Sequence, residues 1–282
     1  MSKKKTEKFI EFWKPYIEKA MEDRVDSLEG VSVLKEAVSY ALFSGGKRVR
    51  PLFYLALVHS IHPVNQEWDW EPSVGEPMLQ VACSFEYFHA FTLIQDDLPC
   101  MDNDALRRGK PSLWKKFGES TALLASNVLL GMSYVSGIYT EGGDNYSDTS
   151  YPFSEMLMPD SVIGGQALDL GLQKGVAREK INYMKTAHFF EKMVYVAESE
   201  CRHDYGKSRT VNRFKDLPEF AVMFGAYFQH RDDYFDSVTD FEKNESKKKM
   251  EQAMEHQNRL LKKMDLQDSV LGGFASWLID KE

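Results

Sequence analysis

The chain has 282 residues, of which 43% are hydrophobic and 28% charged, a balance typical of a globular protein with one large domain or two. The net charge of -8 argues against nucleic acid as the main partner. No stretch is long and apolar enough to span a membrane, and no apolar run follows the basic residues 1–5, so we expect no signal peptide. Three cysteines without metal-ligand spacing (Cys83, Cys100 and Cys201) favour a reducing, cytoplasmic location.

Apolar residues recur at three- and four-residue steps along most of the chain, which predicts amphipathic helices. The expected helices cover residues 6–22, 30–43, 51–62, 76–97, 120–139, 155–171, 177–200, 217–237 and 246–264, with a last short one ending near Trp277. Loops are expected at residues 63–75, 141–153 and 202–216, where breakers or polar residues gather. No alternating run indicates a strand, and no repeat or linker divides the chain. We therefore predict an all-α protein of about ten or more helices, with residues 1–282 in a single domain.

Charge is concentrated in the segment from Phe91 to Lys110, which begins as an apolar helix. Its charged residues are Asp96, Asp97, Asp102, Asp104, Arg107, Arg108 and Lys110, with Glu86 just upstream. Pro99 disfavours helical backbone at the residue before it, so we expect the helix to end near Asp97 and the chain to turn there. Such a turn can bring Asp102 back beside Asp96.

Carboxylates at the edge of a core are stable only when paired or bound to metal. Oxygen ligands without histidine or cysteine suit magnesium, with manganese as an alternative, and such a magnesium ion usually shares its shell with phosphate. The arginines at 107 and 108 offer a diphosphate two bidentate donors. The alternative is a solvated acidic loop with neighbouring ion pairs, which is the more common meaning of an isolated Asp-Asp pair.

A second acidic cluster, residues 228–236, makes the metal hypothesis stronger. Gln229, Asp232 and Asp236 are spaced three and four residues apart, so they share one face of a helix. Stacked carboxylates repel each other unless a positive group lies between them. Two such clusters facing each other would hold a diphosphate through several metal ions.

A basic turn lies upstream of both clusters. Gly45 and Gly46 are expected where one helix ends, and Pro51 at the first position of the next. Lys47, Arg48 and Arg50 lie between them, so the turn suits a phosphate group. A plain helix–helix turn with basic surface residues is the alternative.

Four motifs in order resemble the trans-isoprenyl diphosphate synthases, the polyprenyl synthetase family. They are Gly-Gly-Lys-Arg-x-Arg-Pro at 45–51, Asp-Asp-x4-Asp with Arg-Arg-Gly at 96–109, Lys-Thr at 185–186, and Phe-Gln-x-x-Asp-Asp-x-x-Asp at 228–236. The resemblance extends from about residue 30 to about residue 240. It implies the isoprenoid synthase fold, a helical bundle around a central cavity, and a short-chain farnesyl or geranylgeranyl diphosphate synthase of the bacterial type.

The resemblance also implies roles for individual residues. Magnesium would be held by Asp96, Asp102 and Asp232, supported by Asp97 and Asp233. Isopentenyl diphosphate would be bound by Lys47, Arg50, His89 and Arg108. The allylic diphosphate would be bound by Arg107, Lys185 and Thr186, while Thr186 and Gln229 direct oxygen dipoles at a developing carbocation. Gln166 and Asp169 are expected to support this lining.

The reaction so implied condenses isopentenyl diphosphate with dimethylallyl or geranyl diphosphate in a homodimeric enzyme. Phe91 lies five residues before Asp96, about 7.5 Å along the helix axis, and its ring is expected to form the floor that stops the product at farnesyl diphosphate. Geranylgeranyl diphosphate is the alternative product.

Some positions depart from the family pattern. Gln95 replaces a common histidine, Asn127 replaces a common aspartate, and the lysine-bearing tail after Asp236 is altered. The altered tail leaves a second hypothesis open, a catalytically weak partner subunit of another prenyl synthase. A class I terpene cyclase is a third hypothesis, although those enzymes generally lack the basic turn and the Arg-Arg-Gly motif.

Overall fold

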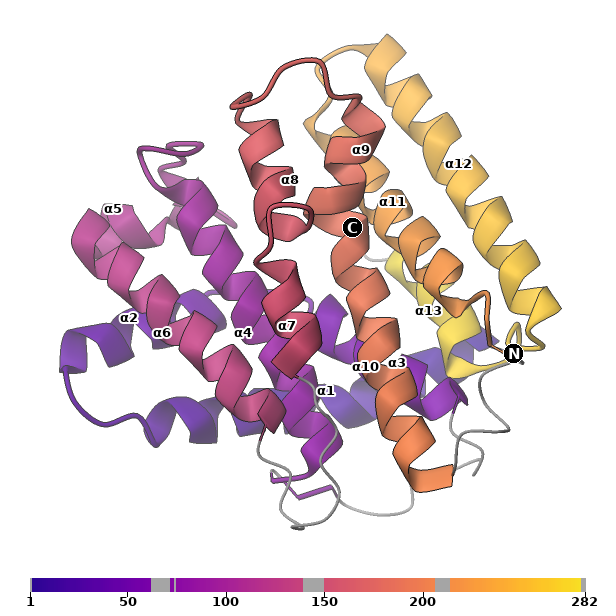
Figure 1. The fold of residues 1–282 in the computed structure, drawn as a ribbon, viewed down its shortest axis with the longest axis horizontal. Coiled ribbons are helices and arrows are strands. Elements are labelled where there is room, and N and C mark those ends of the chain that lie inside the picture. The colour runs from indigo at the N-terminus through magenta and orange to yellow at the C-terminus, as the bar shows by residue number, and fades with distance from the viewer. Residues whose placement is uncertain (1, 62–71, 74, 139–149, 206–213, 280–282) are drawn as a thin grey trace. The chain divides into compact units, whose positions relative to one another are not determined.

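The computed structural model describes residues 2–61, 72–73, 75–138, 150–205 and 214–279 (Figure 1). In the described part of the chain the regular elements are helices, apart from one hairpin of two two-residue strands, which confirms the all-α prediction. Its elements are α1 (Ser2–Asp26), α2 (Ser32–Phe43), α3 (Val49–Ile61), α4 (Pro77–Asp97), β1 (Leu106–Arg107), β2 (Lys110–Pro111), α5 (Leu113–Phe117), α6 (Glu119–Ile138), α7 (Ser150–Met156), α8 (Val162–Asp169), α9 (Arg178–Asn182), η1 (Tyr183–Ala187), α10 (His188–Tyr205), α11 (Leu217–Asp236), α12 (Asp240–Lys263) and α13 (Val270–Ile279).

Several expected boundaries were wrong. The single helix expected at 155–171 is two short ones, α7 and α8, and α7 begins inside the expected loop at 141–153. The helix expected at 177–200 contains a π-helical turn, η1, and continues to Tyr205. The hairpin and α5 were not foreseen, because two-residue strands and five-residue helices leave no periodic signal. Most of the expected loop at 63–75 lies outside the described residues.

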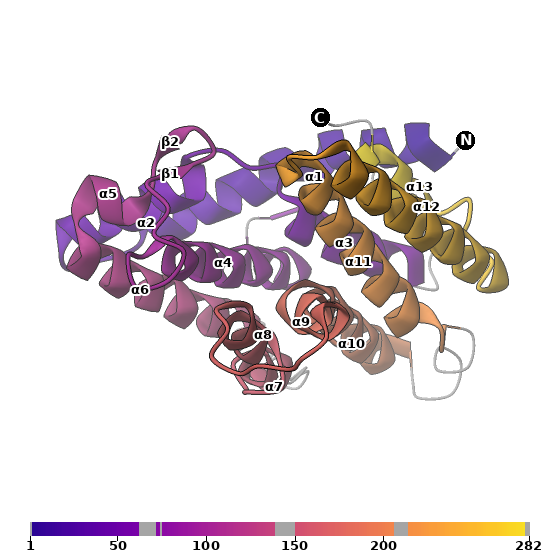
Figure 2. The ribbon, with the colours of Figure 1, turned by 90° about the horizontal axis from the view of Figure 1, so that it is seen from above.

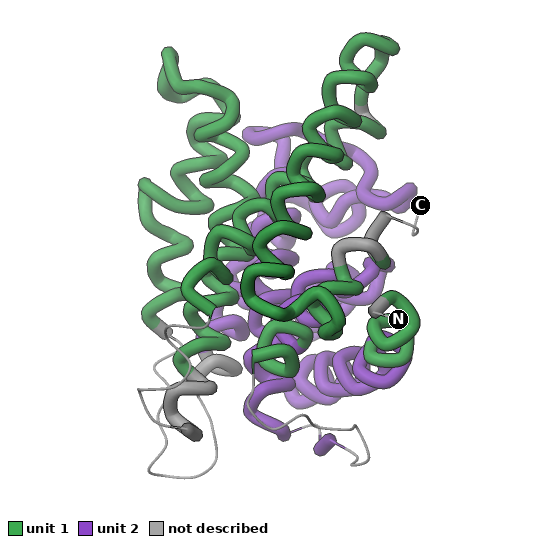
Figure 3. The backbone as a smooth tube through the Cα atoms, turned by 90° about the vertical axis from the view of Figure 1, so that its right-hand side faces the viewer, with its two compact units in different colours: residues 1–9, 56–67, 151–282 green, residues 10–55, 68–150 purple. Residues whose placement is uncertain are grey.

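The chain forms two compact units, which are coloured separately in Figure 3. Unit 1 comprises residues 1–9, 56–67 and 151–282, and unit 2 comprises residues 10–55 and 68–150. Helices α1 and α3 each contribute residues to both units. Each predicted acidic cluster belongs to a different unit, so each is described within its own unit.

Helix α4 is the central element of unit 2. It packs along α6 and also contacts α2 and α5 (Figure 2). Its side chains are buried on most of its circumference, including Phe85, Tyr87 and Phe88. Because α4 is so enclosed, its last turn, which carries the first two aspartates, is held in a fixed place.

Aromatic side chains build the core of unit 1. The Phe190 ring of α10 lies 5.1 Å from that of Phe224 on α11, which lies 6.0 Å from that of Phe274 on α13. Helix α12 packs along α11 (Figure 1). Thr239 and Glu242 form a capping box at the start of α12, which satisfies two backbone N–H groups. These contacts position the end of α11, which carries the second aspartate cluster.

Within the described residues, none of the helices combines the length and apolarity that crossing a membrane would require.

Candidate active site

The acidic loop of unit 2 begins where the sequence predicts. Helix α4 ends at Asp97, and Leu98 has φ −58° and ψ 150°, an extended conformation that suits a residue before proline. The chain then turns back, and the backbone N–H of Asp102 donates a 2.9 Å hydrogen bond to the carbonyl oxygen of Asp96. The expectation that Asp102 returns to Asp96 is therefore confirmed for the backbone.

The two adjacent aspartates have different surroundings. The Asp97 side chain is only 4% exposed and forms an ion pair with Arg107, whose Nε lies 3.0 Å from the Asp97 Oδ1. Burial raises the pKa of Asp97, and the hydrogen bond from Arg107 opposes that rise. Asp96 is partly exposed and Asp102 is exposed. Asp96 and Asp102 are therefore more accessible to solvent than Asp97, which pairs with the hairpin.

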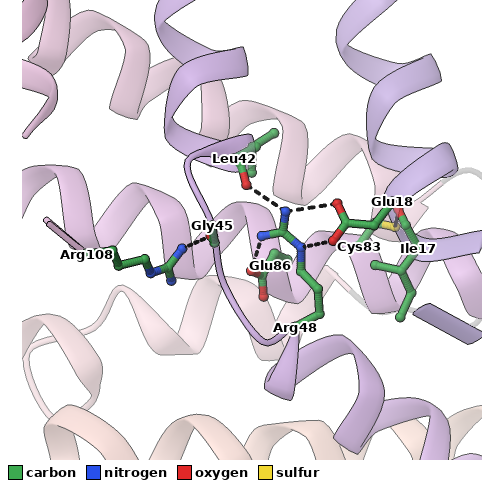
Figure 4. A network of polar contacts seen from close by, with 8 residues as sticks. All are labelled: Ile17, Glu18, Leu42, Gly45, Arg48, Cys83, Glu86 and Arg108. Carbon is green, nitrogen blue, oxygen red and sulfur yellow. Dashed lines mark hydrogen bonds and ion pairs between the residues drawn. The ribbon is translucent and has the colours of Figure 1, made fainter. Parts of the chain in front are cut away.

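The hairpin presents two arginines in different directions. Strands β1 and β2 pair antiparallel, with Arg107 opposite Lys110. Arg108 and Gly109 form the turn with φ of 54° and 75°, left-handed values that glycine adopts without strain. While Arg107 contacts Asp97, the Arg108 guanidinium donates a hydrogen bond to the carbonyl oxygen of Gly45 (Figure 4). The hairpin thus joins the acidic loop to the basic turn.

The basic turn follows the predicted end of α2 at Phe43. Gly45 and Gly46 have φ of 121° and 138°, which other residues rarely adopt. A side chain at Gly46 would also meet the Arg108 guanidinium, because an added Cβ would lie 2.8 Å from its Nη1. Pro51 is the third residue of α3 rather than the first, so its expected position was wrong by two residues. Proline is still tolerated there, because the first four N–H groups of a helix have no partner within it.

Arg48 has a structural role that its sequence context did not reveal. Its side chain is 3% exposed and forms ion pairs with Glu18 at 2.8 Å and Glu86 at 3.0 Å. It also donates a 2.7 Å hydrogen bond to the carbonyl oxygen of Leu42 (Figure 4). Glu86 therefore has a cation as partner and needs no metal. Lys47 is exposed and Arg50 is partly buried, in keeping with the interpretation that these two, rather than Arg48, face a ligand.

His89 lies in a positive field. Burial lowers its pKa well below the usual value, and nearby Arg50, Arg108, Arg107 and Arg48 lower it further. The imidazole is therefore neutral near pH 7. The pKa of Arg108 is lowered as well, first by burial and then by the charges of Arg48 and Arg107. The pKa values of Arg48 and Arg107 are raised instead: burial lowers them, but the carboxylates of Glu18 and Glu86 beside Arg48, and of Asp97 beside Arg107, outweigh it. Positive charge gathered in this way suits an anion.

The second aspartate cluster of unit 1 is tied together by hydrogen bonds. Thr186 donates a 2.9 Å hydrogen bond to Gln229, whose amide nitrogen donates one of 2.9 Å to Asp233. Burial raises the pKa of Asp233, but hydrogen bonds from His230 and Gln229 outweigh this and lower it. The Asp232 side chain is 47% exposed. As in unit 2, the second aspartate is held by the protein and the first is the more accessible.

The Lys-Thr pair lies on the π-helical turn η1, a feature that occurs often at functional sites. Lys185 donates a 2.7 Å hydrogen bond to Asp169, which also pairs with Arg178. Asp169 was expected to support this lining, whereas Arg178 was missed because nothing in its sequence context distinguishes it. Glycines let neighbouring helices approach η1: a Cβ on Gly165 of α8 would lie 2.4 Å from the Lys185 nitrogen. The position of Lys185 thus depends on α8.

Other predicted residues have less distinctive surroundings. The Phe91 side chain is 3% exposed and packs edge-on against Phe88, with ring centroids 5.4 Å apart. Gln166 is buried, and both atoms of its amide lack a hydrogen-bond partner among the described residues. After Asp236 the chain continues into α12, on which Lys247, Lys248 and Lys249 are exposed.

The donor groups fit magnesium. The accessible carboxylates of Asp96, Asp102 and Asp232 offer oxygen only, the preference of a hard cation that keeps waters and phosphate oxygens in its shell. Across the described part of the chain, no group of three or more histidine, cysteine, aspartate or glutamate side chains is close enough to enclose a metal ion.

Comparison with known proteins identifies the family. Residues 31–260 match the model of the family described as polyprenyl synthetase. The farnesyl diphosphate synthase of Geobacillus stearothermophilus is 35% identical over 246 residues, which cover 84% of this chain and 77% of that protein. Geranylgeranyl pyrophosphate synthase 4 of Arabidopsis thaliana is 32% identical over 80% of this chain, which spans 60% of that relative's length.

Solved structures agree on the fold. A geranyltransferase from Legionella pneumophila superposes with a TM-score of 0.83 at 23% identity, covering 100% of this chain and 99% of that one. A geranyltranstransferase from Thermotoga maritima superposes with a TM-score of 0.74 at 23% identity, covering 97% of this chain and 99% of that one. With a family model that covers most of its length and a fold shared with these structures, the chain belongs to the polyprenyl synthetase family.

Proposed function

We propose that the protein is a short-chain trans-prenyltransferase that condenses isopentenyl diphosphate with dimethylallyl or geranyl diphosphate, giving farnesyl diphosphate. The observation that carries the proposal is the ion pair between Arg107 and Asp97. It joins a loop of accessible carboxylates to a pair of arginines within one short segment. A metal-bound diphosphate needs both kinds of group close together, and an ordinary solvated loop needs neither.

The proposed metal ligands are Asp96, Asp102 and Asp232. Magnesium held there would supply Lewis-acid stabilisation of the charge on the departing diphosphate. Asp97 and Asp233 would fix the loop and the helix end that carry these ligands, as their hydrogen bonds to Arg107 and Gln229 indicate.

The remaining residues bind and orient the two substrates. In our proposal Lys47, Arg50, His89 and Arg108 bind the diphosphate of isopentenyl diphosphate, and neutral His89 donates a hydrogen bond without adding charge. Arg107 and Lys185 bind the allylic diphosphate. Both form ion pairs within the protein, Arg107 with Asp97 and Lys185 with Asp169, and these pairs orient the two cations.

The reaction proceeds by ionisation and condensation. The allylic carbon–oxygen bond breaks and the diphosphate leaves with the electron pair. The double bond of isopentenyl diphosphate attacks the allylic cation, and the new intermediate loses a proton to the released diphosphate. Thr186 and Gln229 present oxygen atoms to the developing positive charge. The protein must exclude water, since water would capture the cation.

Product length is proposed to depend on Phe91. Its buried ring lies against Phe88. In our proposal the two aromatics together would stop the growing chain along α4. Farnesyl diphosphate is the product we expect from such a floor. Geranylgeranyl diphosphate is the alternative, and several relatives of this chain carry the name geranylgeranyl pyrophosphate synthase.

We propose further that the enzyme is a cytoplasmic homodimer. The exposed face of α6 carries Leu123, Leu124 and Gly131 and lacks charge between residues 120 and 134, which suits a helix that pairs with a second copy. Light scattering of the purified protein gives the mass directly. A monomer at micromolar concentration would contradict this part of the proposal.

One observation favours a second candidate, a catalytically weak partner subunit. Where family members carry lysines that help to close over the allylic diphosphate, this chain has the capped start of α12 at Thr239. Lys243 is partly exposed on its first turns. A subunit without activity has no physical need for stacked carboxylates, so we rank this candidate second.

A product assay tests the proposal. The purified protein is incubated with isopentenyl diphosphate, magnesium and each allylic primer in turn, and the chain length of the product is determined. A fifteen-carbon product supports farnesyl synthesis, and a twenty-carbon product supports the same reaction with a different floor. Absence of any product from folded protein would overturn the proposal in favour of the partner-subunit candidate.

A further inference from the structure

Arg178, in unit 1, is a cation that the proposed mechanism leaves unused. It is the first residue of α9, and the helices α9, η1 and α10 follow one another without a break from Arg178 to Tyr205. Lys185 comes seven residues after Arg178, close to two turns of a helix, so the two side chains are expected on the same side of this continuous helical stretch.

Asp169 joins the two cations. It is the last residue of α8, which lies beside α9 (Figure 1). One of its carboxylate oxygens accepts a hydrogen bond from Arg178, and the other accepts one of 2.7 Å from Lys185. Burial raises the pKa of Asp169, but the hydrogen bonds and charges of Lys185 and Arg178 outweigh this and lower it. Asp169 is therefore ionised near pH 7, and two cations around one carboxylate leave a net positive charge.

The positive charge lies close to the second aspartate cluster. Burial raises the pKa of Asp233, hydrogen bonds from two neighbours on α11 lower it, and the charge of Arg178 lowers it further. Charges farther apart than about a Debye length of 8–10 Å have little effect on each other in solution, so Arg178 acts on Asp233 from nearby. The turn η1, which carries Lys185, packs against the same helix α11. Both cations therefore lie near the helix end that carries Asp232, a proposed metal ligand.

The guanidinium of Arg178 is the more accessible of the two cations. The Arg178 side chain is 58% exposed, compared with 28% for Lys185. Its hydrogen bond to Asp169 is made through Nη1, whereas a guanidinium has five N–H donors arranged in a rigid fork. An exposed ion pair adds little to stability, so this contact alone contributes little to holding α9 on α8. The outer edge of the fork matches two oxygens of a phosphate group.

We propose that Arg178 is a further binding residue for the allylic diphosphate, donating hydrogen bonds to its phosphate oxygens beside Lys185 while Asp169 holds both cations. The contact is inferred from the structure, and the identity of the substrate rests on the proposed function. The anion is a diphosphate bound together with magnesium, because the carboxylates of α11 would repel a bare anion and a metal ion between them removes that repulsion.

Calorimetric titration of the full-length protein with inorganic pyrophosphate in the presence of magnesium tests this contact without turnover. Arg178→Ala should weaken binding at least about tenfold, the effect of losing a hydrogen bond between charged groups. Arg178→Lys, which keeps the charge but not the fork, should bind with an affinity between those of Arg178→Ala and the wild type.

Lys180→Ala is the matched control. Lys180 is exposed on the same short helix, but it lies two residues after Arg178 and therefore about 200° around the helix axis. The change removes the same charge from the protein and should leave the affinity for pyrophosphate within about twofold of the wild-type value. Equal affinities of Arg178→Ala and Lys180→Ala, or no binding of pyrophosphate by the wild type, would overturn the inference.

A double variant separates a contact with the diphosphate from an indirect effect. If Arg178 acted only by holding Asp169, and through it Lys185, its removal would have no effect once Lys185 is absent. The affinity for pyrophosphate should instead fall further, by at least about threefold, from Lys185→Ala to the double variant Lys185→Ala/Arg178→Ala. The same affinity in both proteins would show that Arg178 does not touch the diphosphate.

Steady-state kinetics identify the substrate concerned. Arg178→Ala should raise KM for geranyl diphosphate about tenfold and leave KM for isopentenyl diphosphate within about twofold of the wild-type value, since other residues are assigned to the second substrate. The opposite pattern would overturn the inference. If the wild type forms no product but Arg178→Ala still weakens pyrophosphate binding relative to Lys180→Ala, the proposed function fails and the binding role of Arg178 stands. If the wild type condenses its substrates and the two variants behave alike, the inference alone fails.

Discussion

The backbone N–H of Asp102 hydrogen-bonds to the carbonyl oxygen of Asp96 at 2.9 Å and so closes the loop that follows α4. Two further bonds tighten the same turn, from the N–H groups of Met101 and Asn103 to the carbonyl of Leu98. These backbone contacts therefore fix the main chain at the two residues that carry the loop's accessible carboxylates. Such a closed loop reduces the conformational entropy that metal binding would otherwise cost.

Asp96→Asn and Asp232→Asn should each lower kcat by at least about a hundredfold. Each removes a proposed ligand of a cation that contributes several kcal/mol to charge stabilisation in the transition state. Because both side chains are partly exposed, the folded structure should survive. The measurement is steady-state condensation at saturating magnesium, with circular dichroism as the check on helix content.

Asp104→Asn is the matched control for these two variants. Asp104 lies in the same segment and is 55% exposed, and its contact with Arg107 is long at 3.7 Å. The kcat of the Asp104→Asn variant should stay within about twofold of the wild-type value, because the change removes only a weak surface ion pair. Near-normal activity of the Asp96 or Asp232 variant would remove the metal assignment.

Lys47 and Arg48 are neighbours in the chain with opposite expected effects. Arg48→Ala should cost about 3–5 kcal/mol in the free energy of unfolding, because it leaves the buried Glu86 without a partner. Lys47→Ala should change that free energy by less than about 0.5 kcal/mol, as is usual for exposed residues.

Kinetics should show the reverse order. Lys47→Ala should raise KM for isopentenyl diphosphate, whereas the fraction of Arg48→Ala that is folded should bind it normally. Urea denaturation and initial rates on the same preparations give both quantities. A Lys47 variant with wild-type KM would mean that the basic turn is only a helix connection.

Much of this arrangement could be read from local sequence. Pro99 ends α4 through its effect on Leu98, and Gly45 and Gly46 end α2 through their left-handed backbone. Both effects act between adjacent residues, so no knowledge of the tertiary structure is needed. The family followed from the order of four motifs, and the residue roles that it implies stay predictions.

Contacts between distant parts of the chain could not be predicted in the same way. Glu18 lies 30 residues before Arg48 in the sequence. It is one of several glutamates on an amphipathic helix, so nothing in the sequence marks it as the partner of Arg48. Arg178 resembles any other surface arginine until Asp169 is seen beside it. The π-helical turn also escaped prediction, because apolar spacing does not distinguish a five-residue π turn from a continuous α-helix.

His89 should make stability depend on pH. Its pKa in the folded protein is lowered, first by burial and then by Arg50 and Arg108, so folding favours the neutral imidazole. The stability that this contributes is fully present above the ordinary value of 6.5 and is lost as pH falls from 6.5 towards the folded pKa. The slope in that range is at most about 1.4 kcal/mol per pH unit.

His89→Gln should remove this part of the pH dependence. His188 has a pKa lowered in the same direction, so the wild type alone does not separate the two residues. The useful quantity is the difference in unfolding free energy between wild type and variant at pH 7.5 and at pH 5.5. On going from pH 7.5 to pH 5.5, the wild type should lose more unfolding free energy than the variant. An equal loss in both proteins would show that His89 titrates normally.

Phe91→Ala should lengthen the main product by at least one five-carbon unit, because it removes the ring that we propose as the floor beside Phe88. A buried phenylalanine replaced by alanine costs about 3–5 kcal/mol, so Phe91→Leu serves as a milder second variant. Products are measured by chromatography after dephosphorylation. If both variants fold and make the wild-type product, the floor lies elsewhere.

Gly165→Ala should lower both stability and kcat through a purely steric effect on η1. A Cβ at this position would lie 2.4 Å from the backbone nitrogen of Lys185, closer than packing allows, so α8 or η1 must shift. Lys185 would then move relative to Asp169, its partner at 2.7 Å, and a shift of about 1 Å can reduce a rate about a hundredfold. Gly75→Ala is the control: its φ lies outside the left-handed region, and the nearest atom to an added Cβ is the Ser73 Oγ, at 4.0 Å. That change should leave both stability and kcat close to those of the wild type. Wild-type activity in a fully folded Gly165→Ala protein would mean that the position of Lys185 does not govern the reaction.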